Sequence, residues 1–365
     1  MDNFDLRYYL STMKDHRIDR KKLHLLEDIV FITIAAVISG ASSWNEIELF
    51  GKHKKEWLSS FLSLPNGIPS HDTFNRFFAT LDPHVFEQVF TNWVNSLVEK
   101  YPGDIIAIDG KTIRGSKGKG FHSATHIVSA FSSHNQLIIG QLQVDQKSNE
   151  ITAIPQLLDA LLIEGCVVTI DAMGCQKEIA KKIRSCKADY VLMVKENQPE
   201  LLDDIKDSFK MLEHDGFTES LDFGHGRIET RKCAVITDLS LIEKPTLWKS
   251  LTSIARVESQ RYIKSTGVTQ SETRYYISSL CADANQLLHA IRSHWAIENS
   301  AHWSLDVAFN EDSSRKRARN AAMNFSIINR LALNMIRKED SKMGLKAKRL
   351  LAGWSQEYIL KVLKF

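Results

Sequence analysis

Apolar residues in the first quarter of the chain recur at steps of three and four, which is the spacing of one helix face. Leu23, Leu26, Ile29, Ile32 and Val37 follow this step, which ends near residue 40. Four shorter segments show helical periodicity as well: 43–50, 54–62, 71–81 and 83–98. A Pro- and Gly-containing loop at 64–69 separates two of them. The first 100 residues therefore predict an all-α domain.

After residue 103 the apolar positions form short runs rich in residues that favour strands. These runs lie at 105–108, 126–131, 137–144, 167–170 and 190–194, and helical periodicity at 151–162 and 176–185 separates the later ones. Three strands followed by alternating strands and helices predict an α/β fold, in which flanking helices cover a mixed sheet.

Residues 217–280 interrupt the alternation with strand-like pieces at 233–237, 253–262 and 272–279, which predict a β-rich insertion. A long helix is expected over 283–309 and another over 317–335. We therefore expect a helical domain at 1–100, an α/β domain at 101–340 that contains the insertion, and a C-terminal tail at 341–365.

Composition narrows the class of protein. The chain has 365 residues, 25% of them charged, and a net charge of +3. The longest apolar run has ten residues, whereas a membrane span needs about 20. The acidic N-terminus lacks the pattern of a signal peptide, so a cytoplasmic protein is expected. The five cysteines include no C-x-x-C pair, which argues against a zinc site of that kind and against a disulfide framework.

Positive charge is concentrated near the C-terminus. Residues 311–365 contain 13 Lys and Arg against 5 Asp and Glu. This surplus fits either a solvated basic helix face or a basic tail that adds non-specific affinity for a polyanion such as DNA. The segment from Ser70 to Arg76 has a polar cap before an amphipathic stretch, and fits either a DNA-contacting helix or ordinary helix packing.

Two of the predicted strands end in a carboxylate. Asp109 follows the run at 105–108, and Asp171 follows the run at 167–170. Taken alone, Asp109 fits an Asp-Gly turn and Asp171 fits the start of a helix. Ligand sites of α/β sheets lie at the carboxyl ends of strands, so the two together favour a two-carboxylate site. Carboxylate oxygens suit Mg²⁺ or Mn²⁺.

A stripe of polar residues at four-residue spacing lies on the expected long helix: His294, Glu298, His302 and Asp306. It fits a metal site of its own or a solvated face. The neighbouring Trp295, Ile297 and Trp303 favour a third interpretation, a helix docked on the sheet with its polar face toward a crevice.

Basic and amide side chains accompany the strand-end carboxylates. Lys111 and Arg114 follow Asp109 closely, and Lys195 and Asn197 follow the run at 190–194. A site that bound only a metal would not need such neighbours, whereas a phosphodiester substrate would.

Five blocks of the sequence closely resemble the H-repeat-associated family of bacterial insertion-sequence transposases: 67–74, 106–114, 147–155, 169–176 and 294–307. The resemblance implies a ribonuclease-H-like core of the DDE type, with the β-rich insertion before the helix that bears the last acid. By position, the catalytic and metal-binding triad is Asp109, Asp171 and Glu298. The implied cofactors are two Mg²⁺ (or Mn²⁺) ions.

The chain departs from the pattern of related transposases near the last acid. Positions that hold Tyr, Arg and Lys in those proteins are Ile291, His294 and Leu305 here. Arg292, His294 and His302 are then the candidates for the phosphate-contacting cation, beside Lys111, Arg114, Lys195 and Asn197.

The resemblance implies strand cleavage at the ends of a mobile element and joining of the freed 3′-hydroxyl to target DNA. The partners that the resemblance implies for the protein are double-stranded DNA, both terminal repeats and target, and at least a second copy of the chain in the synaptic complex. The expected location is the nucleoid in the bacterial cytoplasm. A host nuclease on the same core and a catalytically silent DNA-binding relic stay open as alternatives.

Overall fold

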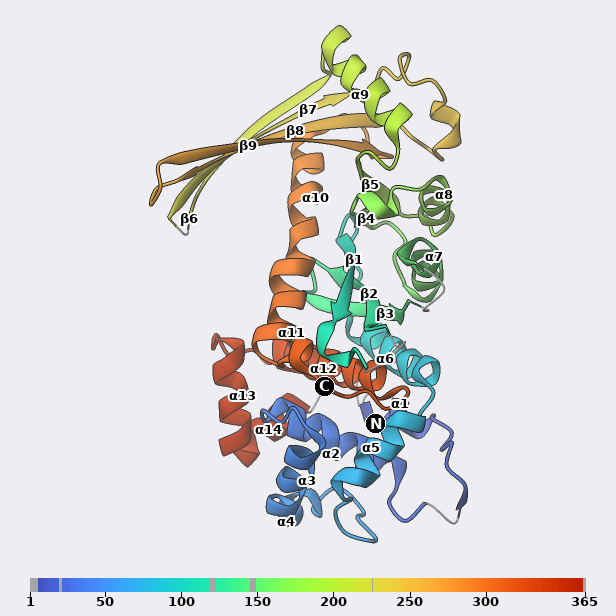
Figure 1. Cartoon of the computed structure of the whole chain (residues 1–365), viewed down its shortest axis with the longest axis vertical. Coiled ribbons are helices and arrows are strands. Elements are labelled where there is room, and N and C mark those ends of the chain that lie inside the picture. The colour runs from blue at the N-terminus through green and yellow to red at the C-terminus, as the bar shows by residue number, and fades with distance from the viewer. Residues whose placement is uncertain (1–5, 20–21, 119–122, 145–148, 225, 364–365) are drawn as a thin grey trace.

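The computed structural model describes residues 6–19, 22–118, 123–144, 149–224 and 226–363. It is elongated, with a helical end in which both chain ends lie and a sheet that extends away from it (Figure 1). The described strands form one nine-stranded sheet in the order β3-β2-β1-β4-β5-β9-β8-β7-β6. None of the described helices is long and apolar enough to cross a membrane.

The N-terminal helices begin at residues that cap them. Ser43 and Glu46 form a capping box, the Ser70 hydroxyl accepts from the Thr73 amide, and Asp82 caps the helix that starts at Pro83. The expected all-α region is confirmed, although 54–62 contributes only a four-residue helix. The helices are α1 (Leu6–Ser11), α2 (Leu26–Ile38), α3 (Trp44–His53), α4 (Lys55–Leu58), α5 (His71–Thr80) and α6 (Pro83–Leu97).

The central sheet is mixed, as the sequence predicts. β1 pairs with β2 antiparallel and with β4 parallel, β2 pairs with β3 antiparallel, and β4 pairs with β5 parallel. This is the ribonuclease-H-like arrangement. Its elements are β1 (Ile105–Ile113), β2 (Thr125–Ser132), β3 (Leu137–Gln143), α7 (Glu150–Ala160), β4 (Val167–Ile170), α8 (Lys177–Ser185), β5 (Asp189–Val194) and α9 (Pro199–Met211).

The β-rich insertion extends the central sheet. It consists of β6 (Gly216–Gly224), β7 (Arg227–Ile236), β8 (Ser253–Ile263) and β9 (Val268–Ser278). Residues 191–194 of β5 pair antiparallel with residues 275–278 of β9, so the ladder is continuous. The strand β6 was not predicted from the sequence; it lies at the sheet edge, and none of its residues is buried.

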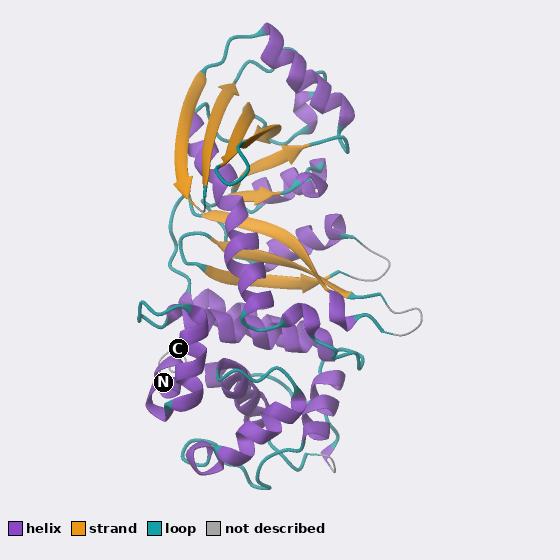
Figure 2. Cartoon of the chain, turned by 60° about the vertical axis from the view of Figure 1, so that its left-hand side comes forward, coloured by secondary structure: helices purple, strands orange, loops and turns teal. Residues whose placement is uncertain are grey.

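The expected long helix after the insertion is present but contains a widened turn. It comprises α10 (Ala284–Ala296), a π-helical turn (Ile297–His302) and α11 (Trp303–Val307). Figure 2 shows α10 lying across the sheet. Its apolar side chains Leu287, Leu288 and Ile291 cover the part of the insertion nearest the central sheet, where Val235, Val257 and Tyr276 are buried.

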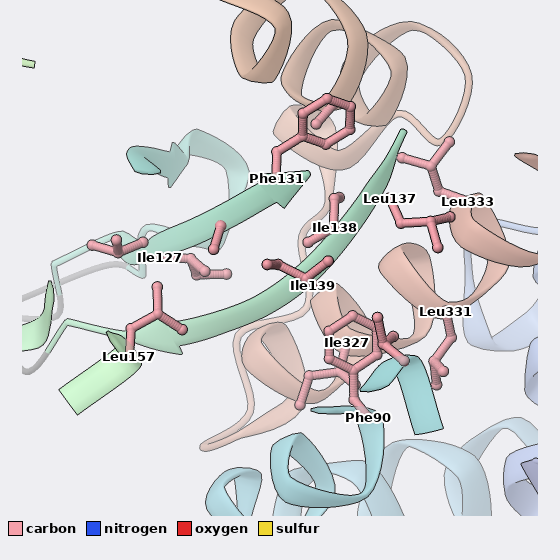
Figure 3. Packing of buried hydrophobic residues seen from close by; sticks show 14 of the residues in the cluster. Phe90, Ile127, Phe131, Leu137, Ile138, Ile139, Leu157, Ile327, Leu331 and Leu333 are labelled. Carbon is pink, nitrogen blue, oxygen red and sulfur yellow. The ribbon is translucent and has the colours of Figure 1, made fainter. Parts of the chain in front are cut away.

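The helix α12 (Ala321–Lys338) joins the helical end to the sheet. Residues 321–336 are all buried, because α12 packs against α2, α5 and α6 on one side and β3 on the other. Ile327, Leu331 and Leu333 meet Phe90 of α6 and the β3 leucine and isoleucines in one core (Figure 3). Helix α12, in the C-terminal part of the chain, is therefore part of the protein core.

Helix α12 also provides hydrogen-bond partners for backbone groups of the edge strand β3. The Asn334 carboxamide accepts from the Ile138 amide at 3.0 Å and donates to the Ile138 carbonyl at 2.8 Å. Near it, Arg330 and Glu311 form a fully buried ion pair at 2.8 Å. Both contacts give buried polar groups a partner, as burial requires.

Residues 341–365, expected as a basic tail, contain two packed helices, α13 (Leu345–Trp354) and α14 (Gln356–Leu363). The buried Glu339 carboxylate accepts hydrogen bonds from Tyr358, Lys361 and Ser341. Burial opposes ionisation, but these hydrogen bonds hold the pKa of Glu339 below its usual value. Several basic side chains near the C-terminus are thus internal partners, including Lys348 and Arg349.

We predict that Asn334→Ala destabilises the fold by about 2–4 kcal/mol, because the Ile138 amide and carbonyl lose their partner while staying buried. Urea unfolding followed by tryptophan fluorescence measures the change. Asn92→Ala, at an exposed site on α6, should alter stability by less than about 0.5 kcal/mol. Equal stabilities for the two variants would contradict this role of Asn334.

Candidate active site

Two carboxylates lie where neighbouring parallel strands reach the same point of the sheet. Ile108 of β1 pairs with Ile170 of β4; Asp109 is the next residue on β1, and Asp171 directly follows the end of β4. The Asp109 side chain is 18% exposed. Asp171 caps a short 3₁₀ turn, because its Oδ1 accepts from the Met173 amide at 3.0 Å. The pairing therefore brings both acids to one side of the sheet.

The third acid, Glu298, lies on the π-helical turn after α10, and this turn packs against β1. Glu298 is exposed, unlike Asp109. Turns of this type are rare and occur often at functional sites. The turn brings the late helix, which the sequence pattern predicted as docked, to the strand that carries Asp109.

The three acids influence each other's ionisation. Burial raises the pKa of Asp109 to about 7, and the charges of Glu298, Asp171 and Glu150 add to the rise. Burial and Glu150 raise the pKa of Asp171, while burial raises the pKa of Glu298 and Asp171 adds to that rise. The site therefore concentrates negative charge that a bound cation would relieve.

The chemistry of the donors fits a hard divalent cation. Asp109, Asp171 and Glu298 offer carboxylate oxygens only, which suit Mg²⁺ or Mn²⁺. In the part of the chain that the structure describes, no three His, Cys, Asp or Glu side chains lie close enough to hold an ion. Side-chain rotation would have to bring the three acids closer for them to share ions.

A fourth acid, Glu150, was not among the predicted site residues. Its Oε1 lies 2.7 Å from His126 Nε2, and His126 Nδ1 lies 2.7 Å from the Thr112 hydroxyl. The Glu150 carboxylate lies directly over Gly110, since a Cβ on that glycine would lie 2.1 Å from Glu150 Oε1. The block at 147–155 signalled this region, but nothing in the sequence indicated that Glu150 meets β1.

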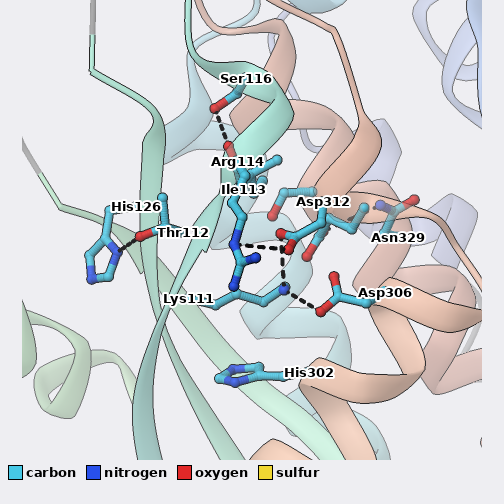
Figure 4. Close-up of polar contacts among 12 residues, drawn as sticks. Lys111, Thr112, Ile113, Arg114, Ser116, His126, His302, Asp306, Asp312 and Asn329 are labelled. Atoms are coloured by element: carbon cyan, nitrogen blue, oxygen red, sulfur yellow. Dashed lines mark hydrogen bonds and ion pairs between the residues drawn. The ribbon is translucent and has the colours of Figure 1, made fainter.

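Lys111 has carboxylate partners. Its buried amino group donates to Asp306 at 2.7 Å and to Asp312 at 3.3 Å, as Figure 4 shows. Arg114 approaches the same Asp312 at 3.4 Å but is 86% exposed. Lys111 therefore ties β1 to the segment after α11, whereas Arg114 is open to a ligand.

Two members of the polar stripe on the late helix, His294 and His302, face the sheet, whereas Glu298 is exposed. His294 Nδ1 lies 3.1 Å from the Thr169 hydroxyl, and His302 Nδ1 lies 3.4 Å from Asp109. Burial lowers the pKa of His294 to about 4 and that of His302 to about 3, so both rings are neutral at pH 7. Each histidine contacts the sheet through a separate partner.

The other predicted phosphate-contacting residues differ in availability. Lys195 is exposed, and its charge lowers the pKa of Asp171 against the larger effect of burial. The Asn197 carboxamide donates to the Ala172 carbonyl at 2.7 Å and so holds the loop after β4. Arg292 pairs at 2.9 Å with Asp222 of β6.

Sequence reasoning missed Arg274, which comes from β9 of the insertion. Its guanidinium lies over the Trp295 ring at 4.8 Å and binds Glu272 at 2.7 Å. Against the effect of burial, it lowers the pKa of Glu298. No motif marks this residue, because its proximity to Glu298 arises only from the packing of the insertion against α10.

A cavity of about 600 Å³ leads to Glu298. It lies between α10 and the outer half of the insertion sheet, where Arg231, Arg261 and Glu272 replace the apolar residues found under the helix. Cross-strand pairs explain the change, since Arg231, Ser259 and Glu272 are register partners and share one face. The face is thus apolar where α10 covers it and charged where it is open.

Comparison with known proteins gives two family matches. Residues 7–94 match a family described as DDE_Tnp_1-associated, and residues 100–335 match the family described as transposase DDE domain. The "Putative transposase YncI" of Escherichia coli O157:H7 is 44% identical over 97% of this chain and 93% of its own length. The "H repeat-associated putative transposase YhhI" of E. coli K12 is 40% identical over 98% of this chain and 97% of its own.

We predict that Lys111→Met lowers stability by about 1–3 kcal/mol, because Asp306 and Asp312 lose their shared partner in a partly buried position. Arg114→Met removes the same charge beside the same Asp312 but at an exposed site, so a change below about 0.5 kcal/mol is expected. Urea unfolding of both variants distinguishes them, and an equal loss would show that Lys111 has no special structural role.

Proposed function

The chain belongs to the DDE transposase family of insertion sequences, and on that basis we propose that it cuts DNA at the ends of its element and joins the freed 3′-hydroxyl to target DNA. The observation that supports this most is the gathering of Asp109, Asp171 and Glu298 from two parallel strands and a late helix. The first two reach the site through strand pairing and the third through helix docking.

In this proposal Asp109, Asp171 and Glu298 would hold two Mg²⁺ or Mn²⁺ ions through their carboxylate oxygens. Bound ions of this kind lower the pKa of a water nucleophile and stabilise the leaving oxygen of a phosphodiester. The protein's own contribution is to hold the acids. The neutral His302 orients Asp109 by contact at 3.4 Å, and the two backbone amides at the 3₁₀ turn orient Asp171.

We assign phosphate contacts to Arg114, Lys195 and Arg274. Arg114 is exposed just beyond the end of β1, Lys195 is exposed near Asp171, and Arg274 lies beside Glu298 at the cavity. The remaining members of the sequence-based set are not assigned such contacts because they contact other parts of the protein: Lys111, Asn197, Arg292, His294 and His302. Arg274 also has a protein partner, Glu272, but its charge acts on Glu298. Related transposases have Tyr, Arg and Lys where this chain has Ile291, His294 and Leu305. Arg274 would supply the phosphate-contacting cation that these positions lack.

The domains would have separate roles in the reaction. Residues 1–100 would recognise the ends of the element, with α5 as the contacting helix, since Arg76 is exposed on it. Residues 101–340 would perform the chemistry, and the helices within 341–365 would brace the helical end. Two copies of the chain would hold two ends in the synaptic complex.

Two alternatives make different predictions about DNA. A host nuclease on this core would cut without terminal repeats, and a relic would bind without cutting. One partial relative bears the name "Inactive transposase YbfQ"; it matches 20% of this chain. Retention of all three acids in this chain supports the active transposase over the relic.

We predict that Asp109→Asn abolishes Mg²⁺-dependent nicking of a duplex that carries the inverted repeat flanking the reading frame, while DNA binding without metal changes less than about twofold. The reason is that the amide replaces an anionic ligand. Asp207→Asn, on the exposed surface of α9, is the control and should nick as the unaltered protein does. Equal nicking of a scrambled duplex would favour the nuclease, and binding without any nicking would favour the relic.

We predict that Arg274→Gln slows nicking about 100-fold with a smaller effect on binding, because one cation beside the reacting phosphate is lost. Arg274→Lys should recover part of the rate, since lysine restores the positive charge but lacks the planar guanidinium group that can donate two parallel hydrogen bonds. Arg256→Gln is the matched control, because Arg256 lies on the opposite face of the same sheet over Phe209. Equal rates for the two glutamine variants would remove Arg274 from the site.

A further inference from the structure

A second cavity lies where the helical end meets the catalytic part of the chain. It has a volume of about 520 Å³ and lies between the segment 310–318 and the N-terminal parts of α3 and α5. Three consecutive basic residues line it, Arg315, Lys316 and Arg317, and no carboxylate is among its described lining residues. The other lining groups include the hydroxyls of Ser42 and Ser313 and the amide of Asn75. Arg315, Ser313 and Asn75 can donate hydrogen bonds to an anion, whereas the Ser42 hydroxyl already donates to Glu46 at 3.0 Å.

The basic segment is held firmly in place. The buried Lys316 amino group donates to the Ser42 carbonyl at 2.6 Å and lies 3.4 Å from the centre of the Phe325 ring. Arg317 Nε donates to the Gly115 carbonyl at 3.1 Å. Gly115 itself packs against this segment, since a Cβ there would lie 2.6 Å from the Ser314 carbonyl oxygen. The cavity is therefore built from fixed backbone, which lowers the entropy cost of binding.

The cavity borders the turn that follows the strand of Asp109. Gly115 belongs to the 3₁₀ turn (Arg114–Ser116) that directly follows β1, the strand of Asp109. Arg114 and Lys117 are exposed on that turn and beside it. On the other side, Asn75 belongs to α5, the helix expected to contact the element ends. Exposed basic side chains therefore lie both on the turn that follows β1 and in the cavity lining next to α5.

We propose that this cavity, which we call the seam pocket, binds the phosphate backbone of the DNA duplex between the bases read by the helical domain and the bond that is cut. The inference rests on the proposed function, because it assumes a DNA substrate. The exposed guanidinium groups of Arg315 and Arg317, in a lining without a carboxylate, suit phosphate oxygens, and the buried Lys316 holds the segment that carries them. The seam pocket would set the spacing between the recognised sequence and the cleavage point, because it is fixed to both α5 and β1.

The test measures binding of 40-base-pair duplexes in EDTA, with no metal present, at several salt concentrations. One duplex carries the inverted repeat that flanks the reading frame, and the other carries a scrambled sequence. Removing one phosphate contact lowers the slope of log affinity against log salt by about 0.9. Arg315→Gln with Arg317→Gln should therefore lower the slope by about 1.8 on both duplexes, since phosphate contacts do not read sequence.

Two matched controls isolate the seam pocket. Lys342→Gln with Lys346→Gln removes the same charge from exposed positions of the same basic C-terminal region, outside the pocket, and should leave the slope nearly unchanged. Ser313→Glu places a negative charge at an exposed lining position without removing an Arg, so it should weaken binding, whereas Ser313→Gln should not. Thermal unfolding of each variant shows that the fold is intact.

The outcomes separate the inference from the proposed function. An equal loss of slope in the two double variants, or none in either, would overturn the seam pocket, as would equal binding by Ser313→Glu and Ser313→Gln. If the unaltered protein does not nick DNA in Mg²⁺ but the salt slopes are as expected, the catalytic proposal is overturned and the seam pocket is retained. Failure of the unaltered protein to bind either duplex would overturn both.

Discussion

The parallel pairing of β1 with β4 is the constraint on which the candidate site depends. It aligns Ile108 with Ile170, so the residue that follows each of them is an acid at the same level of the sheet. A shift of one residue would turn one of the two side chains to the opposite face. The helix α10 then docks on this sheet and brings Glu298 to the same strand. Burial raises the pKa of Asp109 to about 7, and the acids that register and docking bring near it add to the rise.

Much of the fold could be predicted because local periodicity reflects burial on one face. The strand-end acids and the docked late helix followed from short apolar runs and four-residue spacing. The partners of polar side chains could not be predicted, because they depend on contacts between distant segments. Examples are Arg274 beside Glu298, Glu150 beside Gly110 and Lys111 between two aspartates.

Charge counted along the chain was a poor guide to surface charge. The basic surplus near the C-terminus suggested a solvated tail or face, yet Arg330 is fully buried with Glu311, and Lys348 binds Glu339. Deletion of residues 315–365, a natural way to test a tail, would remove the core helix α12. The surplus that remains at the surface is concentrated in short segments such as 315–319, where position matters more than number.

The junction between β9 and α10 restricts where the chain can gain or lose residues. Hydrogen bonds from the side chains of Thr252 and Ser253 hold the Leu280 carbonyl, and Ser278 holds the Leu280 amide. One residue added between this anchor and α10 would rotate the helix by about 100° and turn Glu298 away from β1. The tip between β8 and β9 can vary in length without this effect. Insertions and deletions among relatives should therefore gather at the tips of the insertion and avoid residues 279–298.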